Sequence, residues 1–216
     1  MLKLKEVTKV FDKNALALDK ISFEMRRGEF VFLVGPNQAG KTALLRLIAS
    51  EERPTDGEIV FDGFNSQRIK RGQIPLLRRK MGRIFQDFGL INDMDVFDNL
   101  ALGLRILGRK EKKIKNKVYQ SLEMVGLCGK VKFFPHQLSS GEKQKVAIAR
   151  AIAKDPLLLL ADEPTLNLDE ESMDEILKLL KKINLLGTAV LVATHDLRLC
   201  DGNSAKIIRI EKGKLV

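Results

Sequence analysis

The chain has 216 residues, 44% of them hydrophobic and 31% charged, with a formal net charge of +10. This length suits one large domain, or one domain with a subdomain, and the composition is ordinary for a soluble globular protein. The longest purely apolar run of the second half, residues 157–161, is far shorter than the ~18 residues of a membrane span. The first residues lack the apolar core of a signal peptide. Cys128 and Cys200 have no metal-type spacing and are expected to be buried thiols in a reducing cytosol.

The positive charge leaves several partners open. Nucleic acid and an anionic membrane surface both attract basic proteins, and a well-solvated lysine-rich surface has the same composition. Residues 110–117 are predicted to form the exposed face of a helix whose buried side carries Ile114, Val118 and Leu122. Charge alone therefore does not choose a partner.

The hydrophobic pattern predicts an α/β core with a small β-subdomain and a helical insert. In chain order we expect strands over 2–10 and 20–26 joined by a loop over 14–18, a strand over 30–34, a helix over 43–49, a turn over 53–57, a strand over 58–63, a helix over 73–80, a strand over 81–85, two amphipathic helices within 96–126 that break at Gly108, a helix over 145–154, strands over 157–161 and 188–194, and a strand-like end over 205–216. Between the last two buried strands, apolar residues at helical spacing predict one more helix around residues 173–183.

The strongest motif is a glycine-bounded loop after the buried strand at 30–34. GPNQAGKT at residues 35–42 matches G-x-x-x-x-G-K-[ST], and a helix-forming run follows it. In such a loop the backbone N–H groups and the helix dipole bind a nucleotide's phosphates. Lys41 is placed to reach the β- and γ-phosphates, and Thr42 to ligate Mg²⁺. A simple strand–turn–helix would have the same glycines. The residues expected at the nucleotide are Gly35, Pro36, Asn37, Gln38, Ala39, Gly40, Lys41, Thr42 and Ala43.

A second motif is an apolar strand that ends in two carboxylates, Asp162 and Glu163. The end of a buried strand would place Asp162 over the nucleotide, where it can hold Mg²⁺ alongside Thr42. Glu163 would then polarise the attacking water, a general-base role that typically contributes ~10²–10⁴ in rate. Capping of the next element is the structural alternative for both acids.

The third motif, LSSGEKQ at residues 138–144, precedes the helix expected over 145–154. Ser139 or Ser140 would make an ordinary N-cap. The same helix end can present Ser139 and the Gly141 N–H to a phosphate. Because Lys41 already occupies the phosphate of its own chain, that phosphate would belong to a second subunit.

These motifs, in this order and over essentially the whole chain, resemble the ABC-type ATPases. The resemblance implies one α/β domain, residues 1–216, with a mostly parallel core sheet, an antiparallel β-subdomain and a helical signature subdomain inserted at roughly 87–150. It implies a head-to-tail homodimer that holds two ATP molecules with Mg²⁺ between each phosphate loop and the opposing signature helix. The further residues that it implies at the nucleotide are Phe11 stacked on adenine, Gln86 sensing Mg²⁺ and the water, Ser139, Ser140, Gly141 and Glu142 in the signature, Asp169 across the dimer interface, and His195 on the γ-phosphate.

Within that family, residues 28–34, 73–82 and 84–88 resemble the FtsE-type cell-division ATPases. This resemblance implies a peripheral protein on the cytoplasmic face of the bacterial inner membrane. Its partner would be an integral membrane protein of FtsX type that controls cell-wall hydrolases. A lipoprotein-release or macrolide-export transporter remains the alternative. A nucleic-acid ATPase is not expected, because there is one set of motifs and no long coiled coil between them.

Four positions depart from the usual pattern. Gln38 and Ser140 stand where the family usually has glycine, Leu166 where FtsE-like chains have glycine, and Lys143 where glutamine is usual. Gln38 is expected to cost about 1 kcal/mol if its φ is positive. None of the four removes a group that is expected to contact phosphate or metal, so we expect an active site with slow turnover.

The apolar residues after Gln86 give the last expectation. Phe88 and Leu90 are predicted in a shallow surface groove. The resemblance to ABC proteins implies that this groove receives a short cytoplasmic helix of the membrane partner.

Overall fold

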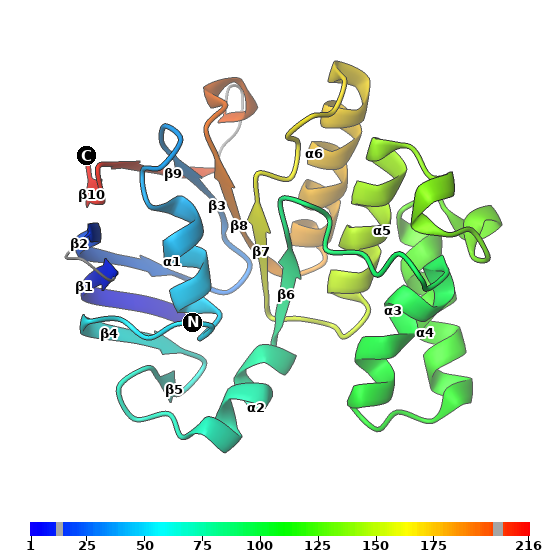
Figure 1. Ribbon diagram of the computed structural model, residues 1–216, viewed down its shortest axis with the longest axis horizontal. Coiled ribbons are helices and arrows are strands. Elements are labelled where there is room, and N and C mark those ends of the chain that lie inside the picture. The colour runs from blue at the N-terminus through cyan, green and yellow to red at the C-terminus, as the bar shows by residue number, and fades with distance from the viewer. Residues whose placement is uncertain (12–14, 201–204) are drawn as a thin grey trace.

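The computed structural model describes residues 1–11, 15–200 and 205–216. Figure 1 shows two sheets on one side of the molecule and a group of helices on the other. The helices and strands are β1 (Leu2–Phe11), β2 (Ala15–Met25), β3 (Phe30–Val34), α1 (Lys41–Ile48), β4 (Asp56–Phe61), β5 (Phe64–Asn65), α2 (Ile74–Arg79), β6 (Met81–Ile84), α3 (Val96–Ile106), α4 (Glu111–Met124), α5 (Ser140–Ile152), β7 (Leu158–Asp162), α6 (Glu170–Leu185), β8 (Ala189–Thr194), β9 (Lys206–Glu211) and β10 (Lys214–Leu215). Short 3₁₀ helices lie at Arg71–Gln73, Cys128–Lys130, Pro135–Gln137 and Leu197–Cys200.

The central sheet has the strand order β10-β9-β3-β8-β7-β6. Five of these strands run parallel, and β10 returns antiparallel to β9. Along β3, Phe32 and Val34 pack into one core while Val31 and Leu33 pack into the other. Such uninterrupted apolar strands are typical of parallel sheets covered on both faces. The carboxyl ends of β3, β7 and β8 therefore meet at one edge, where the motif residues follow.

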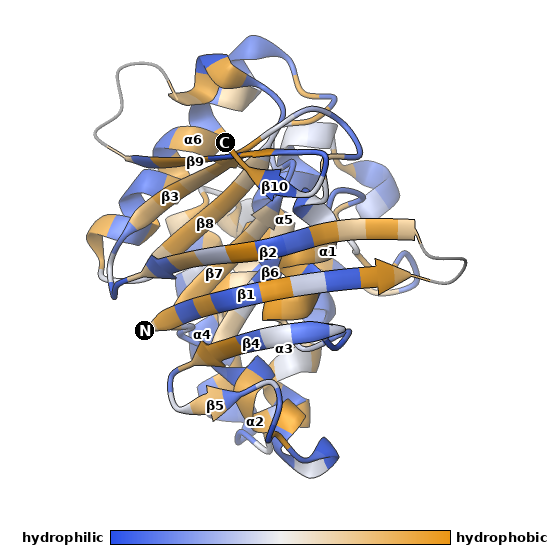
Figure 2. Cartoon of the chain, turned by 90° about the vertical axis from the view of Figure 1, so that its left-hand side faces the viewer, coloured by the Kyte–Doolittle hydropathy of each residue, from blue (hydrophilic) through white to orange (hydrophobic). Residues whose placement is uncertain are grey.

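The second sheet is antiparallel, with the order β2-β1-β4-β5. Buried and exposed residues alternate at the start of β1, which Figure 2 shows as alternating orange and blue. Its inner face shares a core with α1, whose Leu44, Leu45, Leu47 and Ile48 are buried against both sheets. This sheet fixes α1, and so the phosphate loop before it, from the side away from the helices.

The chain between β6 and β7 carries α3, α4 and α5. Their apolar faces form one core with the other face of the central sheet and with α6. Ile114, Val118 and Leu122 are fully buried there, as their spacing predicts. The predicted fold class, with a mostly parallel core sheet, antiparallel β-strands and a helical signature region, is confirmed.

Several local expectations are wrong. Residues 15–18 form the start of β2 rather than a loop, since they pair with β1; Asn14 lies outside the described residues. Helix α5 begins at Ser140, five residues early, because a capping box formed by Ser139 and Glu142 starts it there. Asp56 and Gly57 belong to β4 rather than to the preceding turn. Cys200 is buried, but Cys128 is exposed.

Across the described parts of the chain, no helix combines the length and the apolarity needed to cross a bilayer.

Candidate functional site

The phosphate loop leaves the end of β3 and turns into α1, as its motif predicts. Lys41 begins α1 and is only 6% exposed. Its ammonium group donates hydrogen bonds to the carbonyls of Gly35, at 2.7 Å, and Pro36, at 3.0 Å. It also lies 3.3 Å from Glu163 Oε1. The lysine therefore has acceptors inside the loop and one buried carboxylate at its tip.

Two residues of the loop have left-handed backbone conformations. Gly40 has φ 106°, and a Cβ there would lie 2.7 Å from the carbonyl oxygen of Ala17, so only glycine fits. Gln38 has φ 65° and is exposed. The expected strain at Gln38 is therefore present, at a cost of about 1 kcal/mol.

Asp162 ends β7 and faces the first turn of α1. The Thr42 hydroxyl donates a hydrogen bond of 3.1 Å to Asp162 Oδ1. Burial raises the pKa of Asp162 above its ordinary value of 3.8, although the Thr42 hydrogen bond and the Arg83 charge act in the opposite direction. Among the described residues no cation forms an ion pair with Asp162. A buried carboxylate beside a hydroxyl offers the hard oxygen ligands that Mg²⁺ prefers.

Glu163 follows directly, and its φ of 47° turns its side chain back toward the loop. Its N–H donates to the Ala193 carbonyl on β8, which fixes the backbone. Its Oε2 lies 2.9 Å from His195 Nδ1 and accepts a second, longer bond from the His195 N–H. Lys41, Glu163 and His195 thus form one connected polar cluster built from the ends of three strands.

A pocket of about 430 Å³ opens over this cluster. It is lined by Ala17, Asn37, Gln38, Ala39, Gly40, Lys41, Thr42, Ala43, Gln86, Glu163, Leu166 and His195. Most of the residues expected at one bound phosphate are therefore in one place. Ala17 and Leu166 were not assigned to the site. No local motif could identify Ala17, because it reaches the loop only through the packing of β2 against it.

The remaining predicted residues lie outside this pocket. Ser139, Ser140, Gly141 and Glu142 form the N-terminus of α5, where Ser139 Oγ accepts from the Glu142 N–H at 3.2 Å. Glu142 also pairs with Lys130, and this contact is the largest cause that lowers the pKa of Glu142. Within one chain, none of the four lines the pocket over Lys41.

Asp169 also lies outside this pocket. It caps α6 by accepting hydrogen bonds from the Ser172 N–H and hydroxyl, and these bonds lower the pKa of Asp169. A Cβ added to Gly141 would lie 2.8 Å from Ser172 Oγ, so the N-termini of α5 and α6 abut. Asp169 and the signature residues therefore share one surface.

Phe11 ends β1, is partly exposed, and has the Lys9 ammonium 4.9 Å from its ring centroid. It does not line the pocket over Lys41. The ring face away from Lys9 is the face that a stacked base would use.

The segment after Gln86 is held by Arg150 from the far end of α5. Arg150 donates to the carbonyls of Phe88 and Gly89, both of which have positive φ. This contact joins the pocket-lining Gln86 to the helix that carries the signature residues. No sequence motif pointed to Arg150.

A groove does lie beside this segment, but it is not lined by Phe88 and Leu90 as expected. Phe85 and Ile91 line it, together with Arg83, Arg150 and residues of α2 and α3. Leu90 packs against the helical core instead, and the tight turn at Phe88 takes its side chain elsewhere. A groove is therefore present beside the segment after Gln86, but the prediction that Phe88 and Leu90 line it is wrong.

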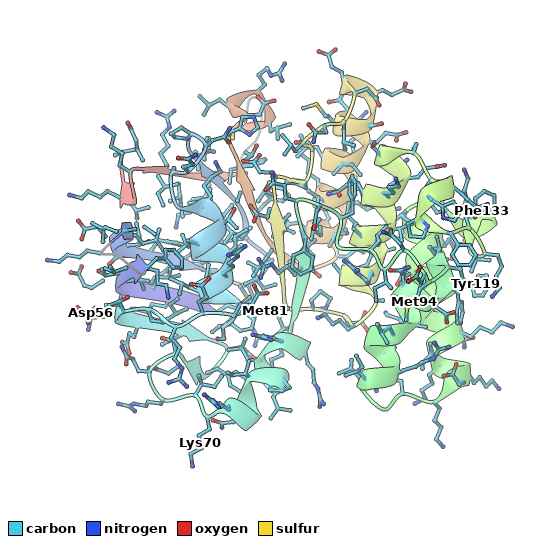
Figure 3. All side chains as sticks on the ribbon, in the orientation of Figure 1. Asp56, Lys70, Met81, Met94, Tyr119 and Phe133 are labelled. Atoms are coloured by element: carbon cyan, nitrogen blue, oxygen red, sulfur yellow. The ribbon has the colours of Figure 1, made fainter. Side chains whose placement is uncertain are left out.

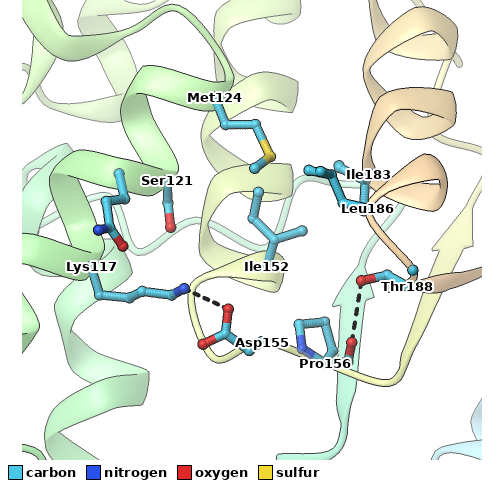
Figure 4. Close-up of a pocket in the computed structure, with 11 residues that line it drawn as sticks. Lys117, Ser121, Met124, Ile152, Asp155, Pro156, Ile183, Leu186 and Thr188 are labelled. Carbon is cyan, nitrogen blue, oxygen red and sulfur yellow. Dashed lines mark hydrogen bonds and ion pairs between the residues drawn. The ribbon is translucent and has the colours of Figure 1, made fainter.

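A larger hollow of about 510 Å³ lies at the opposite ends of the strands (Figure 4). Pro156 and Thr188, which precede β7 and β8, form its floor, and Lys117 pairs with Asp155 at its side. Ligands of parallel α/β sheets bind beyond the carboxyl ends of the strands. The smaller pocket over Lys41 is therefore the candidate active site. No group of three or more His, Cys, Asp or Glu side chains suited to a metal occurs in the described residues.

Comparisons with known proteins agree with this geometry. The family model described as "ABC transporter" matches residues 18–166. The chain is 43% identical over 215 residues to the cell division ATP-binding protein FtsE of Escherichia coli, covering all of this chain and 97% of that protein. It is 43% identical over 217 residues to FtsE of Mycobacterium tuberculosis and 40% over 216 residues to FtsE of Streptococcus pneumoniae, with 94% of each covered.

Solved structures give the same result. A dimeric structure of the ABC transporter cassette MJ0796 superposes with a TM-score of 0.91 at 34% identity, over all of this chain and 96% of that one. A post-hydrolysis structure of the same cassette, bound to ADP and Pi, superposes with a TM-score of 0.90 at 33% identity. The family match and these relatives show that the chain is an ATP-hydrolysing cassette. The chain belongs to the ABC transporter family.

Proposed function

We propose that this chain is the ATP-hydrolysing subunit of an FtsE–FtsX-type complex, which couples ATP-driven closure of a homodimer to a membrane partner that controls cell-wall hydrolysis. The observation that carries the proposal is the similarity to FtsE proteins at 40–43% identity over the whole chain, together with an intact Lys41–Glu163–His195 cluster. The complex would lie on the cytoplasmic face of the bacterial inner membrane.

The resting contacts indicate how the site would respond to ATP. Lys41 bonds two neutral carbonyls of its own loop and pairs with one carboxylate, which together carry less negative charge than a triphosphate. When ATP binds, Lys41 exchanges these contacts for the β- and γ-phosphates. Glu163 is then released to accept a proton from the attacking water, while His195 donates to the γ-phosphate.

Thr42, Asp162 and Gln86 are the residues that would hold Mg²⁺. Their hydroxyl, carboxylate and amide oxygens suit this ion. Bound there, it would supply electrostatic stabilisation of the phosphate oxygens. Burial is the largest cause of the raised pKa of Asp162, and the nearby charges of Arg83 and Lys41 offset it only in part.

The signature residues Ser139, Ser140, Gly141 and Glu142, with Asp169, would complete the site of a second copy. They share one surface, and none reaches the pocket over Lys41 in its own chain. A head-to-tail dimer would make two equivalent composite sites, with Phe11 stacked on each adenine. Residues 87–150 would act as the moving helical subdomain of the single domain.

The groove at Phe85 and Ile91 would receive a short amphipathic helix of the membrane partner. Arg150 ties the groove segment to α5, and Gln86 ties it to the nucleotide pocket. Closure of the dimer over ATP would thus move the groove and the partner helix together.

The test changes one groove residue that does not line the pocket over Lys41. Ile91→Asp places a charge on the partly exposed groove wall, and Ile207→Asp, on β9 with similar exposure, is the matched control. We expect both variants to hydrolyse ATP within a few-fold of the unaltered chain, and only Ile91→Asp to lose the FtsX-type protein in a detergent pull-down. Retained binding would place the partner surface elsewhere. Capture of an exporter-type permease instead would favour the transporter alternative, which the similarity to the MJ0796 transporter cassette keeps open.

A further inference from the structure

The net positive charge of the chain is concentrated in two short segments. Residues 68–80 contain six Lys or Arg and no acidic residue, and residues 105–117 contain seven with one glutamate. Each segment has a net charge of +6, so together they exceed the +10 of the whole chain, and the rest is slightly acidic.

Most of these cations have no acidic partner. Lys80, Arg105 and Lys117 form ion pairs with nearby carboxylates. The others are exposed, and within the described residues none has a carboxylate within 4.0 Å: Arg68, Lys70, Arg71, Arg78, Arg79, Arg109, Lys110, Lys112, Lys113 and Lys115. Arg78 donates to the carbonyls of Ala49 and Ser50, but no carboxylate of the described residues neutralises its charge or those of the other nine, so these charges can attract an external anion.

The two segments lie on one side of the fold. Lys154 joins them, because its ammonium donates to the Arg78 carbonyl at 3.1 Å and shares a small surface hollow with Arg109 and Lys113. In Figure 1, α2 and the turn between α3 and α4 both reach the lower edge, whereas the loop between β3 and α1 is at the upper end. Lys70 projects from that lower edge in Figure 3. We call residues 68–80 and 105–117 the basic edge.

The basic edge also exposes aliphatic side chains. Leu76 is 45% exposed and Ile106 is 72% exposed. Neither segment contains an aromatic residue on which a nucleic-acid base could stack. Exposed aliphatic groups among unpaired lysines and arginines are instead typical of surfaces that lie on anionic lipid.

We propose that the basic edge binds the anionic phospholipid surface of a membrane directly, without the membrane partner. The edge adjoins the groove at Phe85 and Ile91, since Arg78 and Ile106 also line that groove. Lipid contact would therefore hold the chain beside the groove's occupant. Direct lipid binding goes beyond the proposed function, because it requires neither the membrane partner nor nucleotide.

Vesicle co-sedimentation of the purified full chain tests this binding. The vesicles contain phosphatidylglycerol and phosphatidylcholine in equal amounts, or phosphatidylcholine alone. The edge variant is Arg71→Glu with Lys112→Glu, one exposed residue from each segment. The matched control is Lys181→Glu with Lys212→Glu, which has the same change in net charge on α6 and on the turn between β9 and β10.

We expect the unaltered chain and the control to sediment with the anionic vesicles only, and added salt to release both. Each cation near such a surface contributes roughly a fivefold factor in binding, so the edge variant should bind at least ~25-fold more weakly. Equal weakening by the control, or no sedimentation of the unaltered chain, would overturn the proposal. Duplex DNA is added as a competitor at the same phosphate concentration as the anionic vesicles. If the chain binds the DNA as strongly as it binds the vesicles, the basic edge is assigned to nucleic acid instead. The detergent pull-down tests the proposed function separately: if the chain captures no FtsX-type protein but still binds anionic vesicles, the proposed function fails and the lipid proposal stands.

Discussion

The variant Glu163→Gln tests two roles of this side chain separately: its pairing with Lys41, which stabilises the fold, and its proposed role as the general base. Glu163 is only 8% exposed and is the carboxylate next to the buried Lys41 ammonium, at 3.3 Å. Removing one partner of a fully buried ion pair typically costs about 3–5 kcal/mol. Lys41 keeps two carbonyl acceptors, at 2.7 and 3.0 Å, so we expect a smaller loss of about 1–3 kcal/mol.

For a chain of this size each kcal/mol shifts Tm by about 2–4 °C, so Glu163→Gln without nucleotide should melt roughly 2–12 °C lower than the unaltered chain. His195→Ala is the control, because it removes the imidazole contact of Glu163 without leaving a buried cation unpaired, and it should melt within about 2 °C of the unaltered chain. Differential scanning calorimetry of the two variants measures this difference. An unchanged Tm for Glu163→Gln would mean that the Lys41–Glu163 pair contributes nothing in solution.

The same variant should behave differently with ATP and Mg²⁺. Hydrolysis should fall by ~10²–10⁴, as for loss of a general base, while ATP binding persists. Size-exclusion chromatography should then show an earlier, dimer-sized peak that the nucleotide-free variant lacks. Hydrolysis at the unaltered rate together with an unchanged elution volume would refute the assignment of Glu163 as the base.

Three further predictions follow from particular contacts. Gln38→Gly should raise Tm by up to about 2–4 °C because it relieves a positive φ, whereas a β-branched valine there should lower it; an opposite order in thermal melts would show that the loop is not strained. The hydrogen bond from Lys80 is the main cause that lowers the pKa of Asp62. The Asp62 carboxylate therefore stabilises the fold above pH 3.8, and this stabilisation is lost as the pH falls through the lowered pKa. In urea unfolding, Asp62→Asn should be less stable than the unaltered chain at about pH 7 and nearly equal to it below that pKa. Mixing Lys41→Ala chains with Ser139→Ala chains should restore one intact composite site per heterodimer. If heterodimers form but their ATPase activity is no higher than that of the separate variants, the sites are not shared between chains.

The sequence by itself determined the chemistry of the site. The loop before Lys41 and the acids after the strand at 157–161 are local motifs, and their neighbours along the chain dictate their conformation. Parallel strands bring their carboxyl ends to one edge, so the order of strands and motifs was enough to expect Thr42 and Asp162 together, whereas His195 was expected there only from the family resemblance. The helical faces were equally readable, because a period of 3.6 residues identified Ile114 and its companions as buried.

Only the tertiary structure decided which distant residues complete these motifs. Ala17 reaches the phosphate loop through a strand that the sequence suggested was a loop, because pairing with β1 overrode its weak local preference. Arg150 holds the segment after Gln86 from more than 60 residues away, and the groove turned out to use Phe85 and Ile91. The two basic segments reach one edge only because α2, α3 and α4 end on the same side. Such contacts depend on how helices and strands pack across long sequence separations, and no local pattern of residues encodes that packing.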